Sequence, residues 1–172
     1  MYEPVKDGVD KSVHSFSYTE TKPPEDLSDY VHSYWERKTL TTLPDDFRLH
    51  ALPDACVNIL FDQADTRIAG ITVLRTTYEV LSLGKEFHYA GIQLMPGVWQ
   101  GNQNETTDSF VGTPYTGNLP LIETSIALAK VDTIAKLPIL SKLVHLLIGQ
   151  DLVTMNVLTA AILAIQWQTL ST

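Results

Sequence analysis

The segment LPDACVNILFD, residues 52 to 62, has the most regular alternation in the chain, and this alternation decides the predicted fold class. It opens with the turn dipeptide Pro53-Asp54 and continues with two interleaved sets of side chains. Successive side chains of a strand point to opposite faces, so the segment predicts a strand with two different faces. One face carries Ala55, Val57, Ile59 and Phe61, and the other carries Cys56, Asn58, Leu60 and Asp62. The second face could meet solvent, another packed layer or the wall of a pocket.

Similar alternation recurs through the first hundred residues, with turn-forming breaks such as KPPED, LPDD, LGKE and MPG between the segments. The segment KPPEDLSDYV is expected to hold a helical turn. Several short strands at this spacing predict a β-sandwich or a small barrel. The predicted strands are residues 13–20, 31–40, 47–52, 55–62, 67–74, 76–83 and 86–95.

The remainder of the chain changes to a helical pattern after a polar loop at residues 101–117. We predict helices over 119–130, 138–148 and 153–168, with Pro120 in the first turn of the first helix. Pro138 is expected to separate a short turn from the second helix. The sequence therefore divides into a β unit, residues 1–117, and a helical segment, residues 118–172.

The third predicted helix, with Asp151 or Thr154 as its N-cap, is apolar around most of its circumference. Such a helix must be covered on more than one side, either by neighbouring helices in a monomer or by a second subunit. We expect a homodimer, because the small residues permit close approach of two helices. The expected interface residues are Val153, Val157, Ala160, Ala161 and Ala164.

Composition limits the function classes. The 172 residues suit one domain, and the net charge of -8 disfavours nucleic-acid binding by this chain alone. A single cysteine and a polar N-terminus without an apolar signal region favour a cytoplasmic protein. The longest apolar run, residues 157–165, is too short to cross a bilayer, so we expect no membrane partner.

No pattern in the sequence predicts catalysis, a cofactor or a metal site. The five histidines are scattered singly, and no nucleophile elbow, phosphate-binding loop or dinucleotide-binding glycine pattern is present. His50, Cys56 and His88 could still meet in space if their strands are neighbours. The more ordinary interpretation is that they are surface or core residues.

Two strands mix aromatic, polar and small apolar side chains in the way that a ligand cavity requires. Trp35 and Arg37 share one face of the second predicted strand with Val31 and Ser33. His88 shares a face of the last predicted strand with Ala90, Ile92 and Leu94. The alternative is an ordinary sandwich core with Arg37 and His88 near its rim.

Three segments in fixed order resemble the N-terminal domain of a branch of AraC-type transcription regulators. They are DLSDYVHSYWERK, LPDACVNILFD and YAGIQLMPGVW, which together span about residues 27 to 99. One departure is Ala55, where the family usually has glycine, so the turn before the strand is expected to be tighter or shifted. A second departure is the polar insert near 101–117.

The resemblance implies an α+β protein with a cupin-like β-barrel of the jelly-roll type followed by helices. It implies that Val57, Ile59 and Phe61 line the barrel, whereas Cys56 and Asn58 face outward or towards a neighbouring layer, with Asn58 bonded to a loop. The expected ligand-binding residues are Trp35, Arg37, Phe61 and His88, and the effector is an unidentified small molecule. In such regulators DNA is contacted through a C-terminal helix-turn-helix part, which this chain does not contain.

The leading hypothesis is therefore a non-catalytic, ligand-sensing and dimerising module of a transcription regulator. A small cupin-type metal-dependent enzyme is an alternative, although it needs two histidines and a carboxylate in one site. An interaction scaffold with a filled barrel is another alternative.

Overall fold

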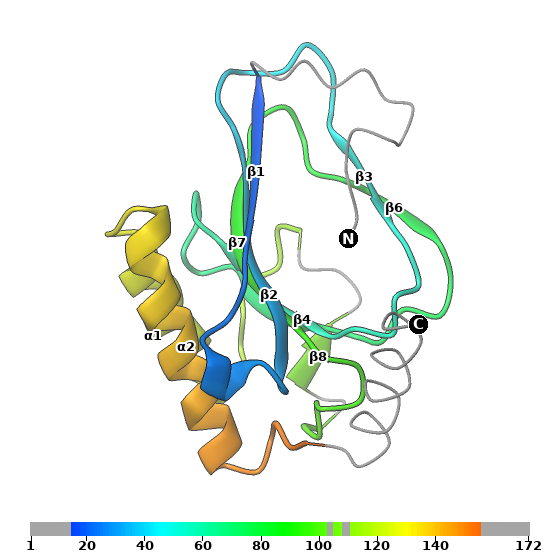
Figure 1. Ribbon diagram of the computed structural model, residues 1–172. Coiled ribbons are helices and arrows are strands. Elements are labelled where there is room, and N and C mark those ends of the chain that lie inside the picture. Colours follow the sequence, from blue (N-terminus) through cyan, green and yellow to red (C-terminus); the bar gives the residue numbers. More distant parts are fainter. Residues whose placement is uncertain (1–14, 103–104, 108–110, 156–172) are drawn as a thin grey trace, which may run out of the picture.

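The computed structural model describes residues 15–102, 105–107 and 111–155, which form a β-rich unit with two helices on one side (Figure 1). Most predicted strands are present with shorter ends, and the expected helical turn is the 3-10 helix η2. The elements in chain order are β1 (Phe16–Thr21), η2 (Glu25–Leu27), β2 (Val31–Thr39), β3 (Arg48–Ala51), β4 (Asn58–Asp62), β5 (Ala69–Thr72), β6 (Glu79–Ser82), β7 (His88–Leu94), β8 (Thr106–Thr107), α1 (Leu121–Leu128) and α2 (Thr133–Gly149).

The strands form two separate sheets. The larger has the order β1-β2-β7-β4-β5-β8, and the smaller is the antiparallel pair β3–β6. The short strand β8 lies in the segment that the sequence predicts as a loop, and it pairs in parallel with β5. The expected closed barrel is therefore wrong for this chain, because the described residues form no hydrogen-bonded ring of strands. The predicted α+β class is correct.

The helices and the β3–β6 pair lie on opposite sides of the larger sheet (Figure 1). The core on the helix side joins strand residues such as Ile59, Phe61 and Ile92 to helix residues such as Leu121 and Leu140. The predicted boundary at 117/118 marks the change from strands to helices, but this core crosses it. The core on the other side consists of Leu60, Leu81, Leu83, Phe87 and Tyr89, with further side chains packed against it.

The face of residues 52–62 that was expected inside the barrel covers the helices instead, and the other face lies between the two sheets. Ile59 and Phe61 pack towards the helices, whereas Leu60 packs towards the β3–β6 pair. The Asn58 side chain bonds to Trp35 rather than to a loop, at 3.3 Å between Nε1 of Trp35 and Oδ1 of Asn58. The amphipathic helices need an apolar sheet face to cover them, and the Ile59/Phe61 face provides it.

A β-bulge changes the faces of β2. The pairing with β7 shifts between Val31 and Ser33, so Val31 does not share the face of Trp35 as the simple alternation predicts. Val31 is instead 1 % exposed in the core on the helix side. Ser33 remains opposite Gln93, in register with the face of Trp35.

Helix α2 begins earlier than predicted and continues through Pro138. Its N-cap is Asp132, whose carboxylate accepts a hydrogen bond from the backbone N–H of Ala135 at 2.9 Å. Proline in a helix loses one backbone hydrogen bond, but burial of one helix face compensates for this loss. The buried residues of α2 are Lys136, Leu140, Leu143, Val144 and Leu147.

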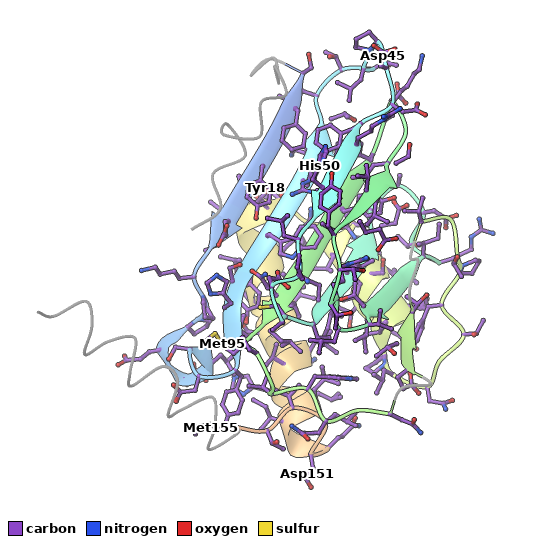
Figure 2. The ribbon with its side chains drawn as sticks, turned by 90° about the vertical axis from the view of Figure 1, so that its right-hand side faces the viewer. Tyr18, Asp45, His50, Met95, Asp151 and Met155 are labelled. Carbon is purple, nitrogen blue, oxygen red and sulfur yellow. The ribbon has the colours of Figure 1, made fainter. Side chains whose placement is uncertain are left out.

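Asp151 ends α2 instead of starting a third helix. It adopts a left-handed conformation, with φ 58, at the position where helices most often have glycine. The N–H groups of Asp151 and Leu152 donate to the carbonyl oxygens of Ile148 and Leu147. This turn and the loop with Asp45 lie at opposite ends of the molecule (Figure 2).

The chain that follows Asp151 pairs with the segment after β7. Val153 forms an isolated bridge with Trp99 and is 0 % exposed, so the expectation that it lies in a helix at a dimer interface is wrong. It belongs to the core of its own chain. Residues 156–168 of the predicted third helix, which include Val157, Ala160, Ala161 and Ala164, lie outside the described residues.

Candidate functional site

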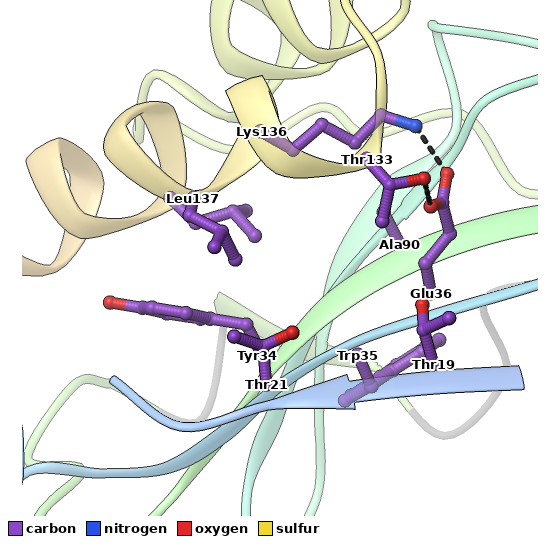
Figure 3. A pocket seen from close by; sticks show the side chains of 10 residues that line it. Thr19, Thr21, Tyr34, Trp35, Glu36, Ala90, Thr133, Lys136 and Leu137 are labelled. Atoms are coloured by element: carbon purple, nitrogen blue, oxygen red, sulfur yellow. Dashed lines mark hydrogen bonds and ion pairs between the residues drawn. The ribbon is translucent and has the colours of Figure 1, made fainter. Parts of the chain in front are cut away.

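A small, half-open cavity lies at the seam between α2 and the strands β1 and β2 (Figure 3). One end is polar and contains the carboxylate of Glu36 together with Thr133 and Lys136. Most of the other lining is apolar or aromatic. We call this site the seam cavity, and its lining residues are Thr19, Thr21, Tyr34, Trp35, Glu36, Ala90, Thr133, Lys136, Leu137 and Leu140.

Glu36 is the centre of a buried polar cluster that joins three elements. It lies on β2 opposite Ala90 of β7, and His88 is the diagonal neighbour on the same face. Nε2 of His88 lies 2.6 Å from Oε1 of Glu36, and Lys136 donates to the same oxygen. Thr133 donates to Oε2. Because Thr133 and Lys136 are three residues apart in a helix, both reach the sheet from one face of α2.

The cluster keeps Glu36 ionised. Burial raises the pKa of this carboxyl, but hydrogen bonds from Lys136, Thr133 and His88 outweigh burial and lower the pKa to about 2. The side chains of Glu36 and Lys136 are only 6 % and 5 % exposed, so each charge depends on the other for compensation. The first turn of α2 also carries the positive end of the helix dipole, which favours a carboxylate there.

Helix α2 has a second polar contact with β2. The Tyr34 hydroxyl and Ser141 Oγ lie 2.9 Å apart. Between this contact and Glu36, the seam has the apolar side chains of Leu137 and Leu140. Figure 3 shows Leu137 facing the ring of Tyr34 across the cavity.

The four predicted ligand-binding residues do not line one pocket. Trp35 and Phe61 pack in different cores, on opposite faces of the larger sheet. Arg37 alternates with Glu36 on β2, and its guanidinium carbon lies 5.1 Å from the ring centre of Tyr18. His88 reaches the seam cavity only through its bond to Glu36. Ligand contact by any of the four stays a prediction.

Trp35 lies on the face of the larger sheet that is turned away from the helices, next to the polar side chain of Asn58. Its ring packs against Gly91, and its indole nitrogen donates to Asn58. Ser33, on the same side of β2, is 2 % exposed, and its hydroxyl has no hydrogen-bond partner within the described part of the chain. The rest of this face is filled by aromatic packing, which includes Phe16, Phe47, Phe87 and Tyr89.

The histidine and cysteine side chains that could have formed a metal site are apart. His50 contacts the Tyr78 hydroxyl at 2.5 Å, while His88 binds Glu36. Cys56 is buried in the turn before β4, where burial and the nearby Asp54 raise the pKa of its thiol to about 12. Among the residues that the structure describes, no three His, Cys, Asp or Glu side chains are grouped as a metal site requires.

Sequence reasoning missed Glu36, Thr133 and Lys136. Glu36 lies between Trp35 and Arg37, on a strand whose preceding residues are aromatic, and this is only a weak indication of a buried carboxylate. The three-residue spacing of Thr133 and Lys136 would have placed them on one helix face, but only if the helix had been predicted to start before Pro138. No sequence rule pairs a strand residue with a helix a hundred positions later.

The comparison with protein families places these residues in a wider group. Residues 19–112 match the family described as a domain of unknown function (DUF6597), and this match covers more than half of the chain. The chain belongs to this family. The matched region contains Glu36 and His88 but ends before α1 and α2, so the seam cavity joins the DUF6597 region to the helices that follow it.

Two further comparisons gave no relatives. No significant match was found among curated proteins or among solved structures. Within the described residues, no helix has the length and apolar character that crossing a bilayer requires.

Proposed function

We propose that this chain is the ligand-sensing and dimerising module of a cytoplasmic AraC-type transcription regulator and that it is not a catalyst. The observation that carries the proposal is the arrangement of the three segments that resemble these regulators. They are far apart in sequence, and they contribute the neighbouring strands β2, β7 and β4. The proposal includes the finer expectation that the two sheets are a jelly-roll-like, cupin-related sandwich.

The turn before β4 supports the idea that the three segments act as one unit. Oδ1 of Asp54 accepts from the backbone N–H of Cys56 at 3.0 Å, and Oδ2 accepts from the side chain of Gln93 at 2.9 Å. The turn of the second segment is thus bonded to the strand of the third. Ala55 in this turn has φ 58, a conformation that favours glycine, which is the residue usual in the resembling family.

In this proposal the signal passes from the sheet to the helices. The two helices share one core with the sheet, and α2 is also held by Glu36. The chain after α2 pairs with the segment that follows β7, since the N–H of Thr154 donates to the carbonyl of Val98 at 2.9 Å. A ligand that moves α2 would therefore move the chain that follows it.

Dimerisation is the second part of the proposal, through the segment containing Val157, Ala160, Ala161 and Ala164. In this proposal the helix-turn-helix domain of the regulator contacts DNA and the sensing module does not, since the net charge of -8 is unsuited to phosphate contacts. The effector is a small molecule.

A fusion experiment tests this function. The chain is placed before a DNA-binding domain that represses a two-site reporter only as a dimer, and a small-molecule library is then screened. We expect repression, loss of repression with Ala161→Glu, and a change in repression by at least one compound class. Ala129→Glu, at an exposed position after α1, is the matched control and should repress normally. A fusion that does not repress although it is folded and expressed would contradict the dimer.

A scaffold with a filled interior is the second candidate function. The observation in its favour is the aromatic cluster between the sheets. The ring centre of Phe47 lies 5.1 Å from the ring centre of Phe16 and 5.1 Å from that of Phe87. Packing of this kind leaves little room for a ligand at that end of the sandwich. A fusion that represses but responds to no compound would favour the scaffold over the sensor.

A further inference from the structure

The ion pair of the seam cavity joins Lys136 to Glu36, and the Lys136 ammonium is the easier of the two groups to replace. Lys136 is the only buried lysine or arginine among the residues that the structure describes. It reaches Glu36 through a flexible four-carbon stem from the first turn of α2. Glu36, in contrast, lies within the larger sheet and is also bound by His88 and Thr133. The carboxylate is therefore the fixed half of the ion pair.

Charge determines which ligand could enter beside this pair. An anionic ligand that took the Lys136 ammonium would leave Glu36 as a buried carboxylate next to a second negative charge, which is strongly unfavourable. A cationic ligand that took Glu36 would leave the site neutral. Lys136 could then extend into water and regain its hydration and side-chain freedom. The net charge of -8 also favours the approach of a cation.

We propose that the seam cavity binds a small primary alkylammonium ion, whose charged group replaces the Lys136 ammonium on Glu36. This inference rests on the proposed sensing function, and it names the ligand class and the way in which α2 would respond.

The lining of the cavity suits such a ligand in size and chemistry. Beyond its Cβ atom the Lys136 side chain is equivalent to propylammonium, so its withdrawal, added to the existing cavity, makes room for a ligand of about three to four carbons. Ala90, Leu137 and Leu140 provide apolar contacts for the alkyl chain. Thr19, which is opposite Glu36 in the β1–β2 register, lines the same cavity, and its hydroxyl oxygen can accept a hydrogen bond from the ammonium group.

Binding would loosen the first turn of α2. The bond from Lys136 to Glu36 is an ion pair between this helix and the sheet, and the ligand would break it while leaving the bond from Thr133 in place. The remaining contacts of α2 are mainly apolar packing against the sheet. Ligand binding at Glu36 would thus remove the ion pair that attaches α2 to the larger sheet.

Chemical rescue tests the proposal without any DNA-binding partner. Lys136→Ala leaves Glu36 without its cation and should lower the Tm of the full chain. Millimolar n-butylamine at neutral pH should then restore stability, because the amine is protonated and occupies the vacated place. A ligand present at about ten times its Kd is expected to raise the Tm by about 3 to 6 °C.

Control compounds and control variants test whether rescue depends on the positive charge of the amine and on Glu36. Butan-1-ol has the shape without the charge, and butyrate has the opposite charge, so neither should rescue Lys136→Ala. The double variant Glu36→Gln/Lys136→Ala should gain nothing from the amine. Lys142→Ala removes an exposed lysine from the same helix and should neither lose stability nor respond.

The outcomes separate this inference from the proposed function. Equal effects of butylamine and butan-1-ol, or a larger effect of butyrate, would overturn the ammonium assignment. If Lys136→Ala does not fold alone, recovery of the folded circular dichroism spectrum on adding butylamine is the same test, and no recovery contradicts the proposal. Rescue in a protein whose fusion never responds to ligands would confirm the site and reject the sensor.

Discussion

The indole ring of Trp35 on β2 lies directly against Gly91 on the neighbouring strand β7. A Cβ atom at position 91 would be 2.4 Å from Cζ2 of Trp35 and 2.8 Å from the carbonyl oxygen of Ile59. Both distances are far below van der Waals contact, and the second involves backbone that cannot move freely. The absence of a side chain at Gly91 is therefore what allows Trp35 to reach Asn58.

The first prediction is that Gly91→Ala destabilises the protein by about 1 to 3 kcal/mol, because the added methyl group displaces Trp35. Urea unfolding followed by tryptophan fluorescence measures the loss. Gly149→Ala is the control, since nothing lies within 4 Å of its added Cβ atom and alanine favours a helix. Equal stability of Gly91→Ala and the wild type would contradict the packing of Trp35.

The second prediction concerns Glu36. Glu36→Gln should lower the stability at neutral pH by about 3 to 5 kcal/mol, because it leaves the buried Lys136 ammonium without its counter-charge. Glu123→Gln, at an exposed position of α1, should change stability by less than about 1 kcal/mol. Chemical denaturation of the three proteins at one pH gives the comparison.

The stability contribution of Glu36 should also depend on pH in a defined direction. The pKa of its carboxyl is about 2 in the folded protein and 4.5 ordinarily, so ionisation favours the folded state. This contribution is complete above pH 4.5 and is lost as the pH falls towards 2. The difference between wild type and Glu36→Gln should therefore shrink over that range, and a difference that grew on acidification would refute the ion pair.

The third prediction is that Ala55→Gly stabilises the protein by up to about 1 kcal/mol. Ala55 has φ 58, which costs alanine about 1 to 2 kcal/mol and glycine almost nothing. The greater freedom of glycine in the unfolded chain offsets part of this gain. Ala51→Gly, in strand β3, is the matched control and should lose about 0.5 to 1 kcal/mol. Thermal unfolding of both variants measures the opposite signs, and a loss at both positions would contradict the strained turn.

The fourth prediction is that Cys56 is unreactive in the folded protein. Cys56 is only 8 % exposed. Burial and the nearby negative charge of Asp54 raise the pKa of its thiol to about 12. At pH 8 only about one thiol in ten thousand is then a thiolate, which is the reactive form. Labelling with iodoacetamide should be very slow in buffer and fast in guanidinium chloride. Rapid labelling of the folded protein would show that Cys56 is accessible.

The sequence by itself determined the local elements of this protein. Period-two alternation in 52–62 and 86–95 is a direct consequence of strand geometry, and the turn dipeptide Pro53-Asp54 ends one element and begins the next. These patterns need no knowledge of distant residues. Strand positions, the α+β class and the presence of helices α1 and α2 after residue 118 could therefore be predicted.

Tertiary structure decided which face of each strand is inside. Alternation places Ile59 and Leu60 on opposite faces, but both faces are covered, one by helices and one by the β3–β6 pair. A local pattern cannot distinguish two buried faces, so the prediction chose the wrong one. The same limit applies to Pro138, because the burial that keeps α2 continuous comes from the sheet beneath it.

The candidate site depended on tertiary structure almost entirely. Glu36 and Lys136 are separated by a hundred residues, and their attraction is strong only because folding removes both charges from water. Sequence specifies the two charges and the helix phase of Thr133 and Lys136, since these follow from neighbouring residues. Only the packing of α2 on β2 brings the charges together, because that contact is a property of two surfaces and not of either segment.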